Sequence, residues 1–178
     1  VPQKHDRHFS FSVLDVLLMG RSPYTSFYSS PGAGDIEKAD GILAAFGLSR
    51  LAHRDYTRLS GGETQLVMIM RALIQDTPVI VMDEPTAHLD FRHELIVLET
   101  IVRLVRDRGL TLIMATHFPN HAFYFENEGI PVRVAFMHHG RVHTAGSPTL
   151  ALTEDNLAGY YQIRARVIEQ DLDEIGRA

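Results

Sequence analysis

The sequence contains no cysteine among its 178 residues. This absence excludes a disulfide framework and a thiolate metal site, and it fits a reducing compartment without requiring one. No apolar run approaches the roughly 18 residues of a membrane span, and the first residues lack a signal-peptide pattern. The chain also has no long Lys/Arg run and carries a net charge of -5, which argues against a nucleic-acid partner. Any role at a membrane must therefore come through a partner protein.

An ordinary globular composition accompanies these absences, with 45% hydrophobic and 22% charged residues. The length allows one full core, or a core with a small satellite. The sequence has no initiator methionine, and its first residues resemble the exit of a strand. We therefore expect the chain to be a piece of a longer protein.

The first half of the chain has helical patterns. Helices are predicted over residues 13–19, over 35–48, and from Ser60 onward, each with apolar residues recurring on one side. A stretch rich in Ser, Pro and Gly over 21–34 predicts a loop. These segments together predict a small helical subdomain.

Strands and helices alternate in the second half. The apolar run from Val79 to Met82 predicts a parallel strand buried on both faces, and Leu110–Ala115 predicts another. Between them, residues 91–108 predict a helix that ends at Gly109. A helix near 120–126, a strand over 132–137, a turn and a short strand over 142–146 follow. The alternation predicts an α/β fold with a parallel sheet flanked by helices.

Two consecutive glycines open the third predicted helix. Ser60 and Glu63 fit a capping box, which explains these two residues but not Gly61 and Gly62. A glycine inside a helix costs about 0.8–1 kcal/mol relative to alanine. Structural capping alone is one interpretation; the other is that bare backbone lets an anion approach the exposed amides at the positive end of the helix.

Polar residues end both predicted parallel strands. Asp83 and Glu84 close the first strand, and Thr116 and His117 close the second. Ligands of open parallel sheets gather outside these carboxyl ends, where Asp83 could hold Mg²⁺ and Glu84 could orient a water. His117 could hold a phosphate and that water in register. The alternatives are a polar strand exit before a proline turn and an ordinary core histidine.

Other candidate sites are weaker. His138, His139 and His143 lie at a predicted hairpin, and His121 follows His117 at helical spacing, but no HExxH pattern supports a zinc site. Adjacent acids at 83 and 84 cannot flank a sugar bond from opposite sides, which argues against a glycosidase.

The order of these motifs resembles the nucleotide-binding subunit of an ATP-binding-cassette (ABC) transporter. The matching segments are "VPQ", "LSGGE", "VIVMDEP", "AHLD" and "ATH". In the family's terms they look like the Q-loop glutamine Gln3, the signature motif 59–63, the Walker B segment 79–84, the D-loop 87–90 and the switch histidine His117. Three further stretches, "FSVLDVLLMGRSPY", "EPTAHLD" and "THFPNHA", look most like importers of iron-siderophore, haem, cobalamin or molybdate-type substrates.

The resemblance implies ATP and Mg²⁺ as cofactors and a role for each matching residue. Catalysis would involve Glu84, His117 and Gln3, and the metal would be held by Asp83 and Gln3. The residues that would bind nucleotide are Ser60, Gly61, Gly62, Glu63 and Asp90: the signature residues would contact nucleotide held by a second subunit, and Asp90 would lie at the dimer interface. Glu63 departs from the commoner glutamine of the signature, but an acid still serves the capping box, so we expect function to survive.

The implied fold is an incomplete P-loop ATPase core with an α-helical ABC subdomain. Residues 1–76 would form the Q-loop and helical subdomain, 77–161 the C-terminal part of the core, and 162–178 a tail. The Walker A pattern GxxxxGK[ST] is missing, because neither lysine, Lys4 or Lys38, precedes Ser or Thr. We expect that loop upstream of Val1, and we expect these 178 residues alone neither to bind ATP tightly nor to be active.

The predicted function is the ATP-hydrolysing subunit of an ABC importer for a metal chelate or related small solute. Its partners would be a second copy or a paired ABC subunit, transmembrane permease subunits that dock near Leu17–Arg21, and indirectly a substrate-binding protein, with no nucleic acid. It would lie peripherally on the cytoplasmic face of the inner membrane. The alternatives are a soluble non-transport ABC ATPase and a non-catalytic cassette remnant; the short separation of Gln3 from the signature favours transport, and Glu84 and His117 argue against a remnant.

Overall fold

The computed structural model describes residues 11–24, 31–162, 164 and 166. Gln3 therefore lies outside the described residues. The chain divides into two compact units, Val1–Thr116 and His117–Ala178, and each is treated by itself. Within the described ranges, no helix combines the length and the apolar character that crossing a membrane requires.

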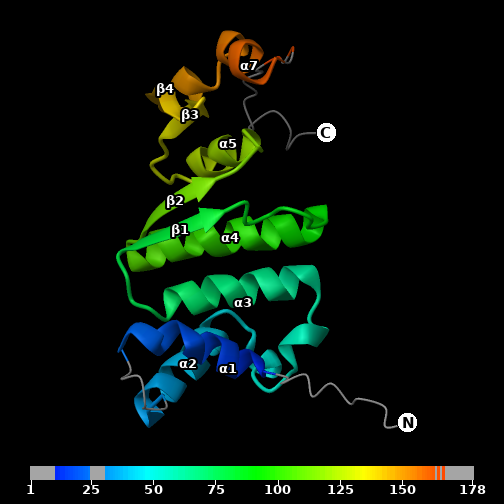
Figure 1. Ribbon diagram of the computed structural model, residues 1–178, viewed down its shortest axis with the longest axis vertical. Helices are drawn as coiled ribbons and strands as arrows, with labels where there is room; N and C mark the ends of the chain where they lie inside the picture. The colour runs from blue at the N-terminus through cyan, green and yellow to red at the C-terminus, as the bar shows by residue number, and fades with distance from the viewer. Residues whose placement is uncertain (1–10, 25–30, 163, 165, 167–178) are drawn as a thin grey trace, which may run out of the picture. The chain divides into compact units, whose positions relative to one another are not determined.

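Helices dominate the start of the first unit (Figure 1). Its elements up to residue 73 are α1 (Val13–Leu18), η1 (Met19–Tyr24), α2 (Ala33–Ala45), η2 (Ser49–Leu51), η3 (Tyr56–Arg58) and α3 (Gly61–Leu73). The predicted loop over 21–34 was wrong at both edges. At the first edge, the 3₁₀ helix η1 extends to Tyr24. At the second edge, α2 begins at Ala33 because Gly32 is its N-cap. The Asp35 carboxylate accepts a hydrogen bond from the Gly32 amide at 3.1 Å, which fixes this earlier start.

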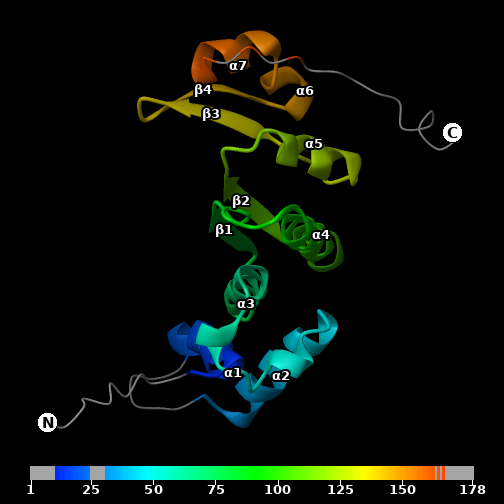
Figure 2. The same ribbon diagram turned by 90° about the vertical axis from the view of Figure 1, so that its right-hand side faces the viewer.

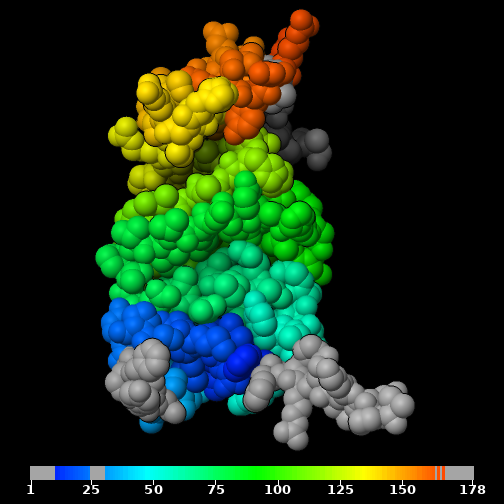
Figure 3. All heavy atoms as spheres, viewed as in Figure 1, coloured from blue at the N-terminus to red at the C-terminus, as the bar shows by residue number. Residues whose placement is uncertain are grey.

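Helix α1 packs against α3 at the centre of the helical part of the first unit. The side chains of Val13 and Leu17 on α1 and of Val67 and Met70 on α3 are completely buried. In the space-filling view the blue atoms of α1 lie directly against the blue-green atoms of α3 (Figure 3). Gly20, in η1 directly after α1, allows the chain to approach the end of α3 closely, because a Cβ there would overlap the Arg71 carbonyl oxygen. The apolar residues that recur at helical spacing in both segments therefore form one shared core.

Polar contacts from η1 fix the C-terminal end of α3. Arg21 donates from Nη1 to the Ile74 carbonyl oxygen at 3.2 Å, and the Tyr24 hydroxyl donates to the Gln75 carbonyl at 2.7 Å. A cation beside the last carbonyls of a helix is favoured by their partial negative charge. Arg21 Nε also donates to Asp35 Oδ1 at 2.7 Å, and this hydrogen bond lowers the pKa of Asp35. Helix α2 is thereby tied to the same end of α3.

In the described part of the first unit, the parallel sheet has two strands, β1 (Val79–Asp83) and β2 (Thr111–Ala115), joined through α4 (Phe91–Arg108). Helix α4 ends at Gly109, which has a φ of 62° as the predicted C-terminal glycine requires. The prediction that these strands are buried on both faces was wrong. The side chains of Ile80 and Met82 face inward, whereas Val81 is 72% and Ile113 57% exposed. The physical reason is that Ile80 and Met82 lie beside Ile101 and Leu104 of α4, whereas no described element of the first unit covers the side chains of the opposite face.

A hairpin and three helices make up the second unit as far as its residues are described. Its elements are α5 (Asn120–Asn127), β3 (Val134–His138), β4 (Arg141–Gly146), α6 (Pro148–Ala151) and α7 (Glu154–Tyr161). Strands β3 and β4 pair with each other in an antiparallel sheet, connected by a tight turn at His139 and Gly140 with positive φ angles. The third strand of the predicted alternation therefore joins a separate sheet. Phe136, Leu152 and Leu157 form the buried core of this unit.

The contact at Gly20 predicts the effect of adding one methyl group. In Gly20→Ala the new Cβ would lie 2.6 Å from Ile74 Cγ2 as well as overlapping the Arg71 carbonyl, so η1 and the C-terminal end of α3 must move apart. We expect the free energy of unfolding to fall by about 1–3 kcal/mol in urea titrations. The control is Gly41→Ala, an exposed position inside α2 with no atom within 4 Å of an added Cβ. That variant should gain about 0.5–1 kcal/mol, and equal effects at both positions would contradict the packing explanation.

Candidate functional site

Two acids mark the end of β1. Asp83 pairs with Ala115 of β2 and is exposed, and the Glu84 amide continues the ladder by donating to the Ala115 carbonyl at 2.9 Å. Glu84 has a φ of 46°, in the left-handed region that non-glycine residues rarely adopt. Such a conformation costs on the order of 1–3 kcal/mol and occurs preferentially at functional sites. The backbone thus turns sharply at the residue predicted to orient water.

A compact loop leads from Glu84 to the start of α4. The Ala87 amide donates to the Glu84 carbonyl at 3.1 Å, and the Leu89 amide donates to the Thr86 carbonyl at 3.2 Å. Asp90 then caps α4, where its Oδ1 accepts from the His93 amide at 3.0 Å. The loop thus places Asp90, the predicted D-loop aspartate, at a helix N-terminus, a position at which an acid is stabilising.

The capping box at the start of α3 is confirmed. Ser60 Oγ accepts from the Glu63 amide at 3.2 Å, and Glu63 Oε2 accepts from the Ser60 amide at 3.1 Å. Arg50 and Arg54 lie 3.2 and 3.5 Å from Glu63 Oε1. The hydrogen bond from the Ser60 amide, helped by the two arginines, lowers the pKa of Glu63. The first turn of α3 is therefore held rigidly by its own residues and by nearby cations.

The two glycines of this turn have different surroundings. Gly62 is buried, and a Cβ there would overlap the ring of His93 and lie 2.6 Å from its Cγ. Gly61 is exposed, and an added Cβ would meet only Leu89 Cδ2, at an ordinary 3.6 Å. Packing against α4 therefore explains Gly62, a reason that the sequence interpretation did not include. Gly61 has no comparable packing reason and remains available for the close approach of an anion.

The first turns of α3 and α4 lie next to each other. Both helices begin on the right-hand side of Figure 1 and run in the same direction, and Figure 2 looks along them. Gly61 lies beside Leu89 and Gly62 beside His93, so the predicted signature motif borders the predicted D-loop and the first turn of α4. The first unit thus brings Ser60–Glu63 and Asp90 together.

His93 is a residue of this region that sequence reasoning missed. Its Nδ1 lies 2.7 Å from Asp90 Oδ2, and its amide and side-chain hydrogen bonds lower the pKa of Asp90. A signal was present, because a histidine three residues after a helix-capping aspartate occupies the position from which a side chain can reach back to the cap. What could not be read from the sequence was its contact with Gly62 on another helix.

The histidines of the second unit do not assemble into a metal site. His117 is exposed and its ring centroid lies 3.9 Å from that of Phe118, while His121 is 3% exposed. His138, His139 and His143 cluster at the hairpin with ring contacts to one another. Across the described residues, no group of three His, Asp or Glu side chains converges as metal ligands would. The catalytic role of His117 stays a prediction.

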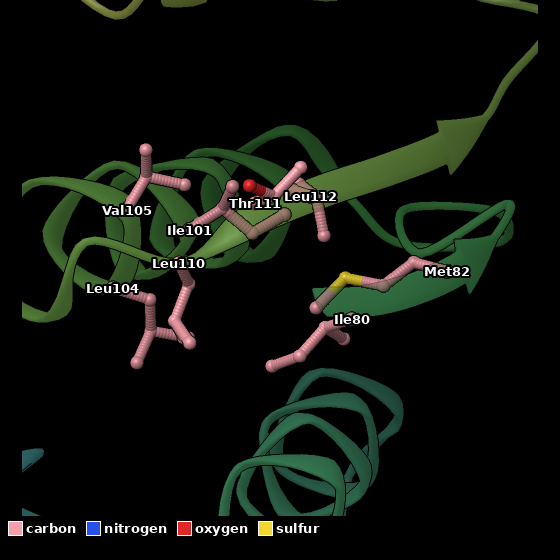
Figure 4. A pocket seen from close by; sticks show the side chains of 8 residues that line it. All are labelled: Ile80, Met82, Ile101, Leu104, Val105, Leu110, Thr111 and Leu112. Carbon is pink, nitrogen blue, oxygen red and sulfur yellow. The ribbon is translucent and has the colours of Figure 1, made fainter. Parts of the chain in front are cut away.

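A small apolar cavity lies between β1, β2 and α4 (Figure 4). Its volume is about 10 Å³, and it is lined by residues such as Met82, Ile101 and Leu112. A space of that size is about enough for one water molecule, and a water needs polar partners that this lining hardly offers. The cavity is a packing gap in the core and is not a ligand site.

The lowered pKa of Glu63 predicts a specific dependence of stability on pH. Because the folded value lies below the ordinary 4.5, ionised Glu63 contributes stability that is present above that pH and is lost as the pH falls through the folded value. Glu63→Gln retains the capping box but has no group to titrate. Between about pH 5 and pH 3, the variant should therefore lose less free energy of unfolding than the unsubstituted chain in urea titrations. Identical losses would exclude Glu63 as a contributor.

A family model described as "ABC transporter" matches residues 3–87. The chain is 36% identical to an uncharacterized ABC transporter ATP-binding protein of Haemophilus influenzae, over 97% of this chain and 64% of that protein. It is 32% identical to the molybdate import ATP-binding protein MolC of the same organism, over 92% of this chain and 62% of MolC. The chain thus spans less than two thirds of the length of these relatives.

Solved structures show the same similarity. A transporter described as being of metal-chelate type, in an inward-facing conformation, aligns with a TM-score of 0.80 and 32% identity, over 92% of this chain and 63% of that one. The small parallel sheet with its helices and the confirmed capping box of the signature motif agree with this likeness. The chain therefore belongs to the ABC transporter family, as part of an ATP-binding subunit.

Proposed function

We propose that the full-length protein containing this chain hydrolyses ATP at a head-to-tail dimer interface to energise an importer. The observation that carries this proposal is the start of α3, where a capping box holds the turn and exposed Gly61 leaves the backbone open. The amides of such a turn carry partial positive charge and suit a phosphate group. In the ABC arrangement that phosphate would belong to ATP bound by the neighbouring subunit.

The end of β1 carries side chains that suit ATP hydrolysis. The exposed Asp83 carboxylate offers the oxygen ligand that Mg²⁺ prefers, and Glu84 follows at a sharply turned position. Bound Mg²⁺ would neutralise charge on the phosphates of ATP. Glu84 would orient the attacking water, while Gln3 and His117 would act as the resemblance implies.

The dimer interface would include the D-loop and the signature together. Asp90 and Gly61 lie on adjacent first turns of α4 and α3, so one surface of a subunit could present both. We propose residues 1–76 as the Q-loop and helical subdomain, 77–161 as the C-terminal part of the ATPase core and 162–178 as a tail. Closure of two subunits around nucleotide would then be the motion that drives transport.

The transported substrate would be a metal chelate or a related small solute. Support comes from two relatives, the molybdate import ATP-binding protein MolC and the transporter described as being of metal-chelate type. A permease would dock near Leu17–Arg21, and a substrate-binding protein would act through it. Since Arg21 contacts the end of α3, force at this surface has a direct path to the signature helix. The subunit would then lie peripherally on the cytoplasmic face of the inner membrane.

Replacing the water-orienting acid tests the proposed chemistry. In the full-length protein, Glu84→Gln removes the carboxylate charge but keeps the shape, so ATP binding should persist. Turnover should fall by roughly 10²-fold or more, as loss of a general acid–base group typically does. Filter binding with labelled ATP and phosphate release measure the two quantities separately. Undiminished turnover would remove Glu84 from the catalytic role.

The two glycines of the signature provide a second test. Gly61→Ala meets only an ordinary contact at 3.6 Å, so stability should change little, whereas Gly62→Ala must displace the ring of His93. If the absence of a side chain at Gly61 lets phosphate approach the backbone, Gly61→Ala should lower the ATPase activity of the full-length protein by about tenfold or more. The urea midpoint of this variant should stay unchanged. Gly62→Ala should lower both. Full activity in Gly61→Ala would refute the anion-approach role.

A further inference from the structure

We propose that His93 is a positioning residue that joins the D-loop aspartate Asp90 to the signature turn, so that both meet the neighbouring subunit as one rigid surface. The inference rests on the proposed function, because it assigns a role within the same interface. It concerns a residue outside the motifs that the sequence analysis identified.

One side of the His93 ring contacts Asp90. The Nδ1 atom lies 2.7 Å from Asp90 Oδ2, and the backbone amide of the same histidine donates to Asp90 Oδ1 at 3.0 Å. Both carboxylate oxygens are therefore engaged by a single residue, which fixes the side-chain rotation of the aspartate. Two directed contacts to one carboxylate give geometric specificity that one contact does not.

The carbon edge of the same ring fills the space beside Gly62. A Cβ on Gly62 would lie 2.6 Å from His93 Cγ and 2.9 Å from His93 Cβ, and it would overlap Cδ2. The absence of a side chain at Gly62 is therefore what lets α3 approach the ring so closely. Close-packed groups of this kind transmit small displacements, because they cannot be compressed.

These two contacts make His93 a spacer between two functional turns. The His93 side chain is 34% exposed and lies between Asp90, on its own helix, and buried Gly62, on the other. A shift of one turn must then move the other. Since misplacement of positioned groups by about 1 Å can cost on the order of 10²-fold in rate, a spacer of this kind affects turnover more than nucleotide affinity.

Two substitutions separate the contacts. His93→Asn keeps an N–H donor near the position of Nδ1 but removes the ring carbons that pack on Gly62. His93→Phe keeps a ring of similar size but has no donor for Asp90. His53→Asn is the matched control, since His53 is an exposed histidine of the same unit, outside the predicted interface.

The experiment measures kcat and KM for ATP in the full-length protein, with the urea midpoint of every variant recorded alongside. His93→Phe should lower kcat by about tenfold or more while KM changes less than about twofold, and His93→Asn should show a smaller loss. In an Asp90→Asn background, His93→Phe should cause a smaller further loss than in the unsubstituted protein, because the contact that it removes is already weakened. His53→Asn should match the unsubstituted protein.

The outcomes distinguish this inference from the proposed function. An unsubstituted full-length protein without ATPase activity would overturn both. An active protein whose His93→Phe variant keeps the full kcat would overturn only the positioning role, because a ring that merely fills space is retained in phenylalanine. Additive losses of kcat in the Asp90→Asn background would also overturn it, since His93 would then act independently of that carboxylate.

Discussion

The close contact between the first turns of α3 and α4 is the constraint on which the site depends. Gly62 has no side chain, and the ring of His93 occupies the space that a Cβ would need. Through this contact the signature turn lies beside the loop that begins at Glu84 and ends at Asp90. A larger residue at position 62 would separate two helices whose starts must be adjacent for the proposed function.

Helix α3 is fixed at both ends by polar contacts of opposite character. Its N-terminus is closed by the Ser60–Glu63 box, in which a carboxylate faces the positive end of the helix. Its C-terminus receives the Arg21 guanidinium and the Tyr24 hydroxyl. The buried face between these ends packs on α1. A displacement applied at η1 therefore moves the whole helix, because neither end can unwind cheaply.

Local sequence signals predicted much of the fold and of the site. The capping box at Ser60, the extent of α4 and its end at Gly109 each depend on a few neighbouring residues, and the structure confirms them. Predictions that depend on distant packing were less successful. The exposure of Val81 is set by which elements cover the sheet, and the need for glycine at position 62 comes from His93, 31 positions further along the chain. No pattern within one helix contains that information.

The left-handed backbone of Glu84 limits how this position can change during evolution. Asparagine, aspartate and glycine adopt such a φ most readily, so they would relieve the local strain. Each of them, however, shortens or removes the carboxylate-bearing chain. The backbone conformation and the reach of the side chain therefore favour different residues at position 84. Glutamate at this position combines an unfavourable φ with the longer reach that the proposed water-orienting role requires.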